Sequence, residues 1–128
     1  MTTTSAEHAV TALLDTIAEA WEAGDGDRFA SVFTDDADFV NIRALALRGR
    51  KEIAEHHNML FSTIYKGTSI RSEDTRIRLI HPGVATIEQF AIVQIEGEER
   101  RAHMLAVAVE TPEGWALQAL HNMIPFTG

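Results

Sequence analysis

Apolar residues recur at helical spacing in the first part of the chain. From Ser5 onward they follow at intervals of four, three and four, and so line one face of a helix: Val10, Leu14, Ile17 and Trp21. Ser5 fits the N-cap of this helix and Gly24 its C-terminal stop. Residues 24–33 predict a second, shorter helix, with Asp25 near its N-terminus.

A strand is predicted next, over residues 37–42, and residues 43–49 leave room for another. Residues 51–67 return to helical spacing. The stripe of this third helix combines apolar residues with one histidine: Ile53, His57, Leu60, Phe61 and Ile64.

The rest of the chain predicts long strands joined by tight turns. The strands cover about 68–81, 84–96, 100–110 and 115–124, and the turns between them carry Gly83, Gly97 and Gly114. Helices followed by a meander of strands indicate an α+β fold in one domain, residues 1–128. Because long antiparallel sheets bend, we expect three N-terminal helices packed on a curved antiparallel sheet that leaves a cavity.

Both faces of this sheet are predicted to be apolar. In residues 102–110 one face carries Leu105, Val107 and Val109, and the other carries Met104, Ala106 and Ala108. The helices cover only one face, and an antiparallel sheet in a monomer usually exposes a polar second face. The pattern therefore predicts a homodimer through the sheet.

Charge and composition exclude several classes of function. The net charge of −8 disfavours nucleic-acid and anionic-membrane partners. No cysteine is present, no segment resembles a signal peptide or a membrane span, and the cytoplasm is the expected compartment. The six histidines show no HxH or HxxxH spacing, so no metal is expected. No dinucleotide, P-loop or serine-hydrolase motif occurs, so no cofactor is expected either.

Polar side chains within apolar elements are the candidates for a binding site. His57 on the helical stripe predicts either a pocket residue or a core histidine bonded to a backbone carbonyl. Asp38 alternates with apolar residues and is placed under the helices as a possible partner of His57, unless it lies at a frayed strand start in water. Asn41 points the other way from Asp38 in a regular strand.

Other candidates are less specific. His103 and Glu88 interrupt the central strands and face either the cavity or the dimer interface. Arg100, with its charged neighbours, is expected in a solvated hairpin tip. Four aromatic residues are expected in the core or the cavity wall: Trp21, Phe61, Tyr65 and Trp115.

The last strand contains an adjacent His121–Asn122 pair. Consecutive residues of a strand point to opposite faces, so the pair predicts two separate sites. His121 shares its phase with Trp115 and Leu117 and is expected to face the cavity. Asn122 is expected at the dimer face or the rim.

Four segments carry a resemblance to a known family: AWEAGDGDRFASVFTDDADFVN (20–41), RGRKEIAEHHNMLF (48–61), YKGT (65–68) and ALHNM (119–123). They resemble the NTF2-like, or SnoaL-like, superfamily and within it the SgcJ/EcaC group. The resemblance implies a cone-shaped α+β fold and usually a dimer. It also implies that five residues occupy motif positions: Asp38, Asn41, His57, His121 and Asn122. Residues 43–49 depart from the group by lacking tryptophan.

The resemblance implies a pocket for an apolar, partly oxygenated ligand of polyketide type, and leaves open whether the protein is an enzyme. An enzyme of this kind is a cofactor-independent cyclase, isomerase or dehydratase. Asp38 or His57 would then be the base, and His121 or Asn122 would polarise a carbonyl or enolate oxygen. Trp21, Phe61, Tyr65, His103 and Trp115 would help to bind the ligand. The alternatives are a non-catalytic carrier or accessory subunit and a dimerisation module.

Overall fold

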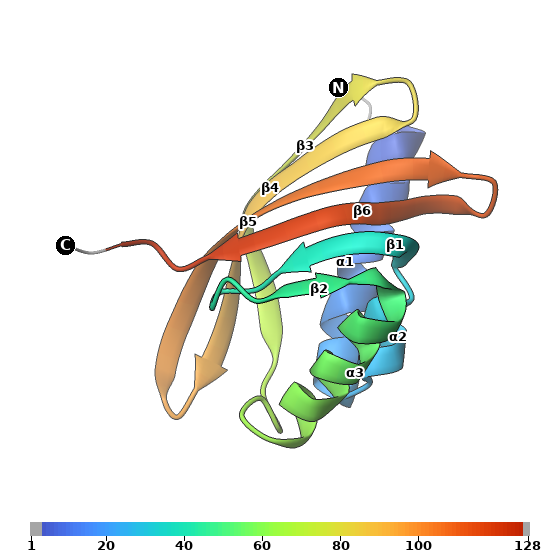
Figure 1. The fold of residues 1–128 in the computed structure, drawn as a ribbon. Helices are drawn as coiled ribbons and strands as arrows, with labels where there is room; N and C mark the ends of the chain where they lie inside the picture. Colours follow the sequence, from blue (N-terminus) through green and yellow to red (C-terminus); the bar gives the residue numbers. More distant parts are fainter. Residues whose placement is uncertain (1–3, 127–128) are drawn as a thin grey trace.

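The computed structural model describes residues 4–126, and its helices precede most of its strands. The helices are α1 (Ser5–Ala23), α2 (Gly26–Ala30) and α3 (Gly49–Ser62). The strands are β1 (Phe33–Val40), β2 (Ala46–Arg48), β3 (Ile70–His81), β4 (Val84–Ile95), β5 (Glu98–Thr111) and β6 (Gly114–Met123). The α+β class, with helices packed on a curved sheet, is confirmed (Figure 1).

Helix ends follow local chemistry. Thr4, one residue before the predicted N-cap, caps α1, because its Oγ1 accepts the Glu7 N–H at 3.0 Å. Gly24 ends α1 as predicted, in the left-handed conformation at φ 69°. Thr63 leaves helical geometry at φ −126°, ψ −104°, so α3 ends before the predicted residue 67. No helix within residues 4–126 is long and apolar enough to cross a membrane.

The sheet runs in the order β2-β1-β6-β5-β4-β3 and is mixed. The expectation of a purely antiparallel sheet is wrong at one place, because β1 and β6 pair in parallel. All the other neighbouring strands pair antiparallel. Hydrophobic alternation carries no direction, so the sequence could not show that β6 returns beside β1 with the same polarity.

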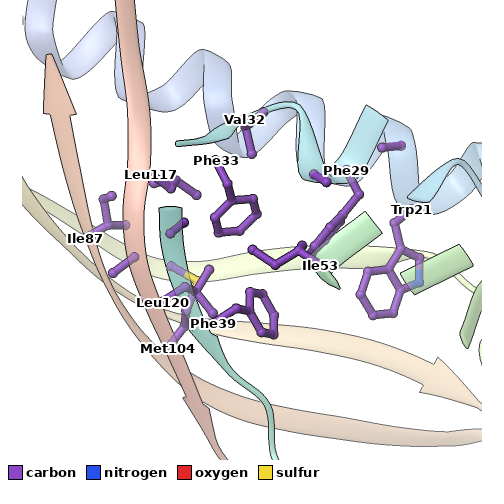
Figure 2. Packing of buried hydrophobic residues seen from close by; sticks show 14 of the residues in the cluster. Trp21, Phe29, Val32, Phe33, Phe39, Ile53, Ile87, Met104, Leu117 and Leu120 are labelled. Carbon is purple, nitrogen blue, oxygen red and sulfur yellow. The ribbon is translucent and has the colours of Figure 1, made fainter. Parts of the chain in front are cut away.

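The helices cover one face of the sheet, here called the inner face, while no helix or strand of residues 4–126 covers the outer face (Figure 1). Strand alternation gives β5 its inner residues Met104, Ala106 and Ala108, which are all buried. Figure 2 shows how the core forms between the inner face and the helices, with Phe33, Ile53 and other apolar residues in contact. Outer-face Leu105 is 52% exposed.

A β-bulge in β6 changes which residues face inward. Ala108 of β5 pairs with Leu117, and its neighbour Val107 pairs with Ala119, so Gln118 is the extra residue. Leu117 before the bulge and Leu120 after it are both buried against the core, although their spacing of three residues puts them on opposite faces of a regular strand. The side chain of Gln118 donates to Asp36 Oδ1 at 3.2 Å.

The short helix α2 is held against α3 by a polar contact. Asn58 of α3 accepts the Gly26 N–H through Oδ1 at 2.8 Å and donates through Nδ2 to Asp27 at 3.0 Å. Gly26 lies so close to this amide that an added Cβ would be 2.5 Å from Asn58 atoms. This close approach fixes Phe29 of α2 against the inner end of the cavity described next.

Candidate functional site

A cavity of about 210 Å³ lies between the helices and the inner face of the sheet. Residues of the three helices, of β1 and the loop that follows it, and of the strands β3 to β6 line it. Most of the wall is apolar, and its members include Leu14, Ile17, Phe39, Leu60 and Met104. The cavity matches the predicted hollow of the curved sheet.

His57 lies in the wall of this cavity and is almost fully buried, with 3% of its surface exposed. Its ring stacks on Phe29, with centroids 4.1 Å apart and planes 20° apart. Nδ1 lies 2.8 Å from the backbone oxygen of Ile53. A carbonyl only accepts, so Nδ1 carries the proton and Nε2 is left as an acceptor. Both alternatives for His57 therefore hold together: it is a core histidine bonded to the backbone and a cavity residue.

Burial lowers the pKa of His57 to about 4, since desolvation penalises the imidazolium more than the Ile53 carbonyl stabilises it. The neighbouring His56 lowers the pKa further through charge repulsion. The imidazole is therefore neutral at neutral pH.

Trp21 and Tyr65 form the aromatic wall, with ring centroids 5.0 Å apart. The indole Nε1 donates to Thr68 Oγ1 at 2.9 Å, and that hydroxyl donates to the Tyr65 backbone oxygen at 2.6 Å. The tryptophan N–H is thus satisfied without a ligand, and the ring serves as an apolar surface. Phe61 packs behind Trp21 at 5.1 Å and does not line the cavity.

Two asparagines line the cavity in different ways. Asn41 Oδ1 accepts the backbone N–H groups of Arg43 and Leu45 at 2.9 and 3.1 Å, and so fixes the loop between β1 and β2. Asn122 Oδ1 is buried and has no hydrogen-bond partner in the described part of the chain. A buried acceptor without a partner costs about 1–3 kcal/mol, so its presence needs a specific explanation, such as a bound water or ligand.

Gln89 is a site residue that the sequence reasoning missed. It lines the cavity from β4 with 5% of its surface exposed. Its Oε1 accepts the Thr75 hydroxyl at 2.8 Å, and its Nε2 lies 3.8 Å from Met104 Sδ. The signal was available, because Gln89 has the same strand phase as Ile87 and Ala91.

The structure reverses the predicted orientations in β6. His121 is exposed on the outer face, while Asn122 lines the cavity, so the prediction that His121 faces the cone is wrong. The bulge at Gln118 is the physical reason, because it shifts the strand phase after Leu117.

Asp38 is also outside the cavity. Ala37 and Phe39 point into the core from β1, and Asp38 points outward, where it pairs with Arg48 of β2 at 2.6 Å. The predicted contact between Asp38 and His57 is therefore absent. The prediction assigned Asp38 to the wrong face of β1, because Phe39 and not Asp38 packs under the helices.

Two further candidates lie elsewhere. His103 faces outward beside Glu88, with Nε2 to Oε2 at 3.0 Å, which selects the outer-face alternative. Trp115 is half-buried against the core, beyond the cavity wall. Arg100 is exposed near the hairpin tip, as expected, and it also lines the cavity, as does Arg43. Across residues 4–126, no cluster of three or more potential metal ligands is present.

This fold and cavity define a class of small α+β proteins with a helix-lined hollow in a curved sheet. A family model for the SnoaL-like domain matches residues 10–127, and the chain belongs to that family. The predicted NTF2-like, SnoaL-like resemblance is confirmed at this level, and the narrower SgcJ/EcaC group stays a prediction. No protein of curated function matches the chain.

Solved structures share the fold. A domain of unknown function with a cystatin-like fold from Nostoc punctiforme is 33% identical, with a TM-score of 0.89 over 98% of this chain and 81% of that chain. An uncharacterised protein with a cystatin-like fold from Caulobacter vibrioides is 25% identical, with a TM-score of 0.87 over 96% of this chain and 92% of that chain. An NTF2-like protein from Novosphingobium aromaticivorans is 16% identical, with a TM-score of 0.81 over 96% and 84% of the two chains, and shows the fold alone.

Proposed function

We propose that the protein binds a small apolar, partly oxygenated molecule in the cavity. The observation that carries the proposal is the combination of an apolar wall with polar atoms that the protein itself leaves without partners. These are Asn122 Oδ1 and, within the described residues, the acceptor Nε2 of His57. A site of this composition is typical of small-molecule pockets, in which a few polar groups orient an otherwise apolar ligand.

The volume restricts the size of the ligand. At about 210 Å³ the cavity lies below the roughly 300 Å³ at which drug-sized pockets begin. An apolar cavity of about 150 Å³ accommodates benzene. The site therefore suits one substituted ring or a short branched chain, which is at the small end of the polyketide-type ligands that the family resemblance implies.

Binding is tested with a neutral probe, 3-phenylpropan-1-ol, by isothermal titration calorimetry. Ala18 of α1 lines the cavity, so Ala18→Leu should fill part of it and abolish binding. Ala12→Leu is the matched control, because Ala12 lies on the exposed side of the same helix and its variant should bind like the wild type. Equal binding by both variants, or no binding by the wild type, would contradict the proposal.

Proton-transfer catalysis at the same site is the second candidate, and the free lone pair of His57 Nε2 favours it. The low pKa of His57, about 4, argues against strong catalysis. A general base works best when its pKa is close to the pH, so this imidazole is a weak base near pH 7. Deuterium exchange into the bound ketone 4-phenylbutan-2-one, followed by NMR, separates the candidates. A catalyst accelerates exchange and loses the acceleration in His57→Phe, whereas a binding protein gives the solution rate in both.

We also propose that a second copy of the chain covers the outer face. Leu105 and Met123 are 52% and 59% exposed there, beside the half-buried Val107 and Val109. The face carries charges of both signs, so the same patch on two copies can be self-complementary, as a twofold interface requires. Sedimentation should show a dimer that Leu105→Glu dissociates. Leu79→Glu, at 50% exposed but on the inner side of the sheet edge, should remain dimeric.

A further inference from the structure

The cavity carries a charge bias opposite to that of the chain. The protein has 19 acidic and 11 basic residues, yet the cavity wall formed by residues 4–126 contains no aspartate or glutamate. Two arginines and two histidines do: Arg43, Arg100, His56 and His57. Because His57 is neutral, the arginines supply the fixed positive charge of the site.

Neither arginine is neutralised by the protein within the described residues. Other arginines make ion pairs, among them Arg48 with Asp38 and Arg50 with Asp35. Arg43 and Arg100 have no carboxylate within 4.0 Å in residues 4–126. Arg76 and Arg78 also make no ion pair within residues 4–126, but they do not line the cavity, so the feature specific to Arg43 and Arg100 is that two unpaired arginines lie at one cavity.

Strand geometry separates Arg100 from its neighbour. Arg101 points to the outer face, where it pairs with Glu73 at 3.0 Å and lies 4.9 Å over the ring of Phe90. Arg100, one residue earlier, points to the inner face and reaches the cavity. Of two adjacent arginines, the outer one is neutralised and the inner one is left for the site.

Arg43 is held at the cavity by a fixed turn. Asn41 Oδ1 accepts its backbone N–H at 2.9 Å, and Ala44 next to it adopts a left-handed conformation at φ 61°. Arg43 therefore approaches from the loop between β1 and β2, while Arg100 approaches from β5. Both side chains are exposed whereas His57 is buried, so the two arginines border the solvent-facing side of the cavity.

We propose that the ligand is an apolar monocarboxylate, whose ring or short chain enters the cavity while Arg43 and Arg100 bind its carboxylate at the entrance. This inference rests on the proposed binding function and names the ligand class. Guanidinium groups bind carboxylates through paired, charge-assisted hydrogen bonds. The net charge of −8 repels ligands of higher negative charge more strongly, so a single carboxylate is favoured over a polyphosphate.

The test uses three probes with the same apolar body: 3-phenylpropanoate, 3-phenylpropan-1-ol and 3-phenylpropylammonium. Calorimetry at pH 7 should rank the acid tightest and the ammonium weakest, with about a tenfold difference between acid and alcohol. Arg43→Gln and Arg100→Gln should each weaken the acid several-fold and leave the alcohol unchanged.

Arg76→Gln is the matched control, because Arg76 lies on the outer side of β3, makes no ion pair among the described residues and does not line the cavity. It should affect neither ligand. If acid and alcohol bind equally, or if Arg76→Gln weakens the acid as much as the cavity variants do, the carboxylate inference is wrong while the binding function stands. If Ala18→Leu leaves acid binding intact, the acid binds outside the cavity and the inference is overturned. If the alcohol does not bind, the proposed function itself fails.

Discussion

The two ends of the core are built from the same strands and helices but are filled differently. At the closed end, Phe33, Ile53, Ile87 and Leu117 are fully buried and pack against one another (Figure 2). At the open end, the same sheet presents Gln89 and Asn122 to a cavity. The closed end follows the packing rule of protein interiors, which leaves few voids.

The contrast shows that the cavity is a local interruption of close packing and that the rest of the core is well packed. Polar residues and empty volume coincide at the cavity, and one turn of α3 separates Ile53 of the closed end from His57 of the open end. A protein that only needed stability would fill this volume with apolar side chains. Substitutions at one end at a time should therefore have different effects.

The largest effect is expected at the closed end. Leu117→Ala should lower the free energy of unfolding by about 2–5 kcal/mol, because Leu117 is 0% exposed and its removal leaves a cavity in close-packed surroundings. The same change at Leu14, which borders the existing cavity, should cost less, since part of that side chain has no packing partner. Urea unfolding measures both, and equal costs would remove the distinction between the ends.

The open end should make stability depend on pH through His57. The unfolded histidine takes up a proton below about pH 6.5, whereas the folded one does so only near its pKa of about 4. The unfolded state therefore binds more protons in this window, and stability falls as the pH drops, by roughly 3 kcal/mol from this residue.

His57→Phe should lack this pH-dependent loss of stability. The unfolding free energy of the variant, relative to that of the wild type, should therefore rise as the pH is lowered from 6.5 to 4. His121→Gln serves as the control, because His121 is exposed on the outer face. If the difference in unfolding free energy between wild type and His57→Phe stays constant across this pH range, the pKa of His57 is not lowered by folding.

Asn122→Leu should make the open end resemble the closed end. Replacing a buried acceptor without a partner by an apolar group should raise the free energy of unfolding by about 1 kcal/mol and weaken binding of 3-phenylpropan-1-ol. His121→Leu, the adjacent change on the outer face, should leave binding unaltered. Destabilisation of the Asn122 variant would mean that its oxygen is satisfied in solution.

The smallest effect is expected at Asp38. Its ion pair with Arg48 is more than half exposed on both sides, so Asp38→Asn should change stability by less than about 1 kcal/mol. It should leave ligand binding unchanged, since Asp38 lies outside the cavity. Loss of binding in this variant would restore the role that the sequence alone assigned to it.

The order of elements could be predicted from the sequence, because the helical stripe ending at Trp21 and the glycine turns between strands are local signals. The placement of His57 was predictable for the same reason. Three features were not: the parallel pairing of β1 with β6, the outward phase of Asp38, and the bulge in β6. Each depends on how distant strands meet, and single-strand alternation leaves phase and direction open.

The bulge at Gln118 shifts the alternation of inner and outer residues in β6 by one position. Residues before it are assigned to faces in one phase and residues after it in the other, so the adjacent His121 and Asn122 are alternative linings of one pocket. A slip of the strand end by one residue would exchange them and give the cavity an ionisable group in place of an amide. The same ten residues of β6 can thus present either an amide or an imidazole to the cavity, and Gln118, the residue left out of the strand pairing, selects the amide.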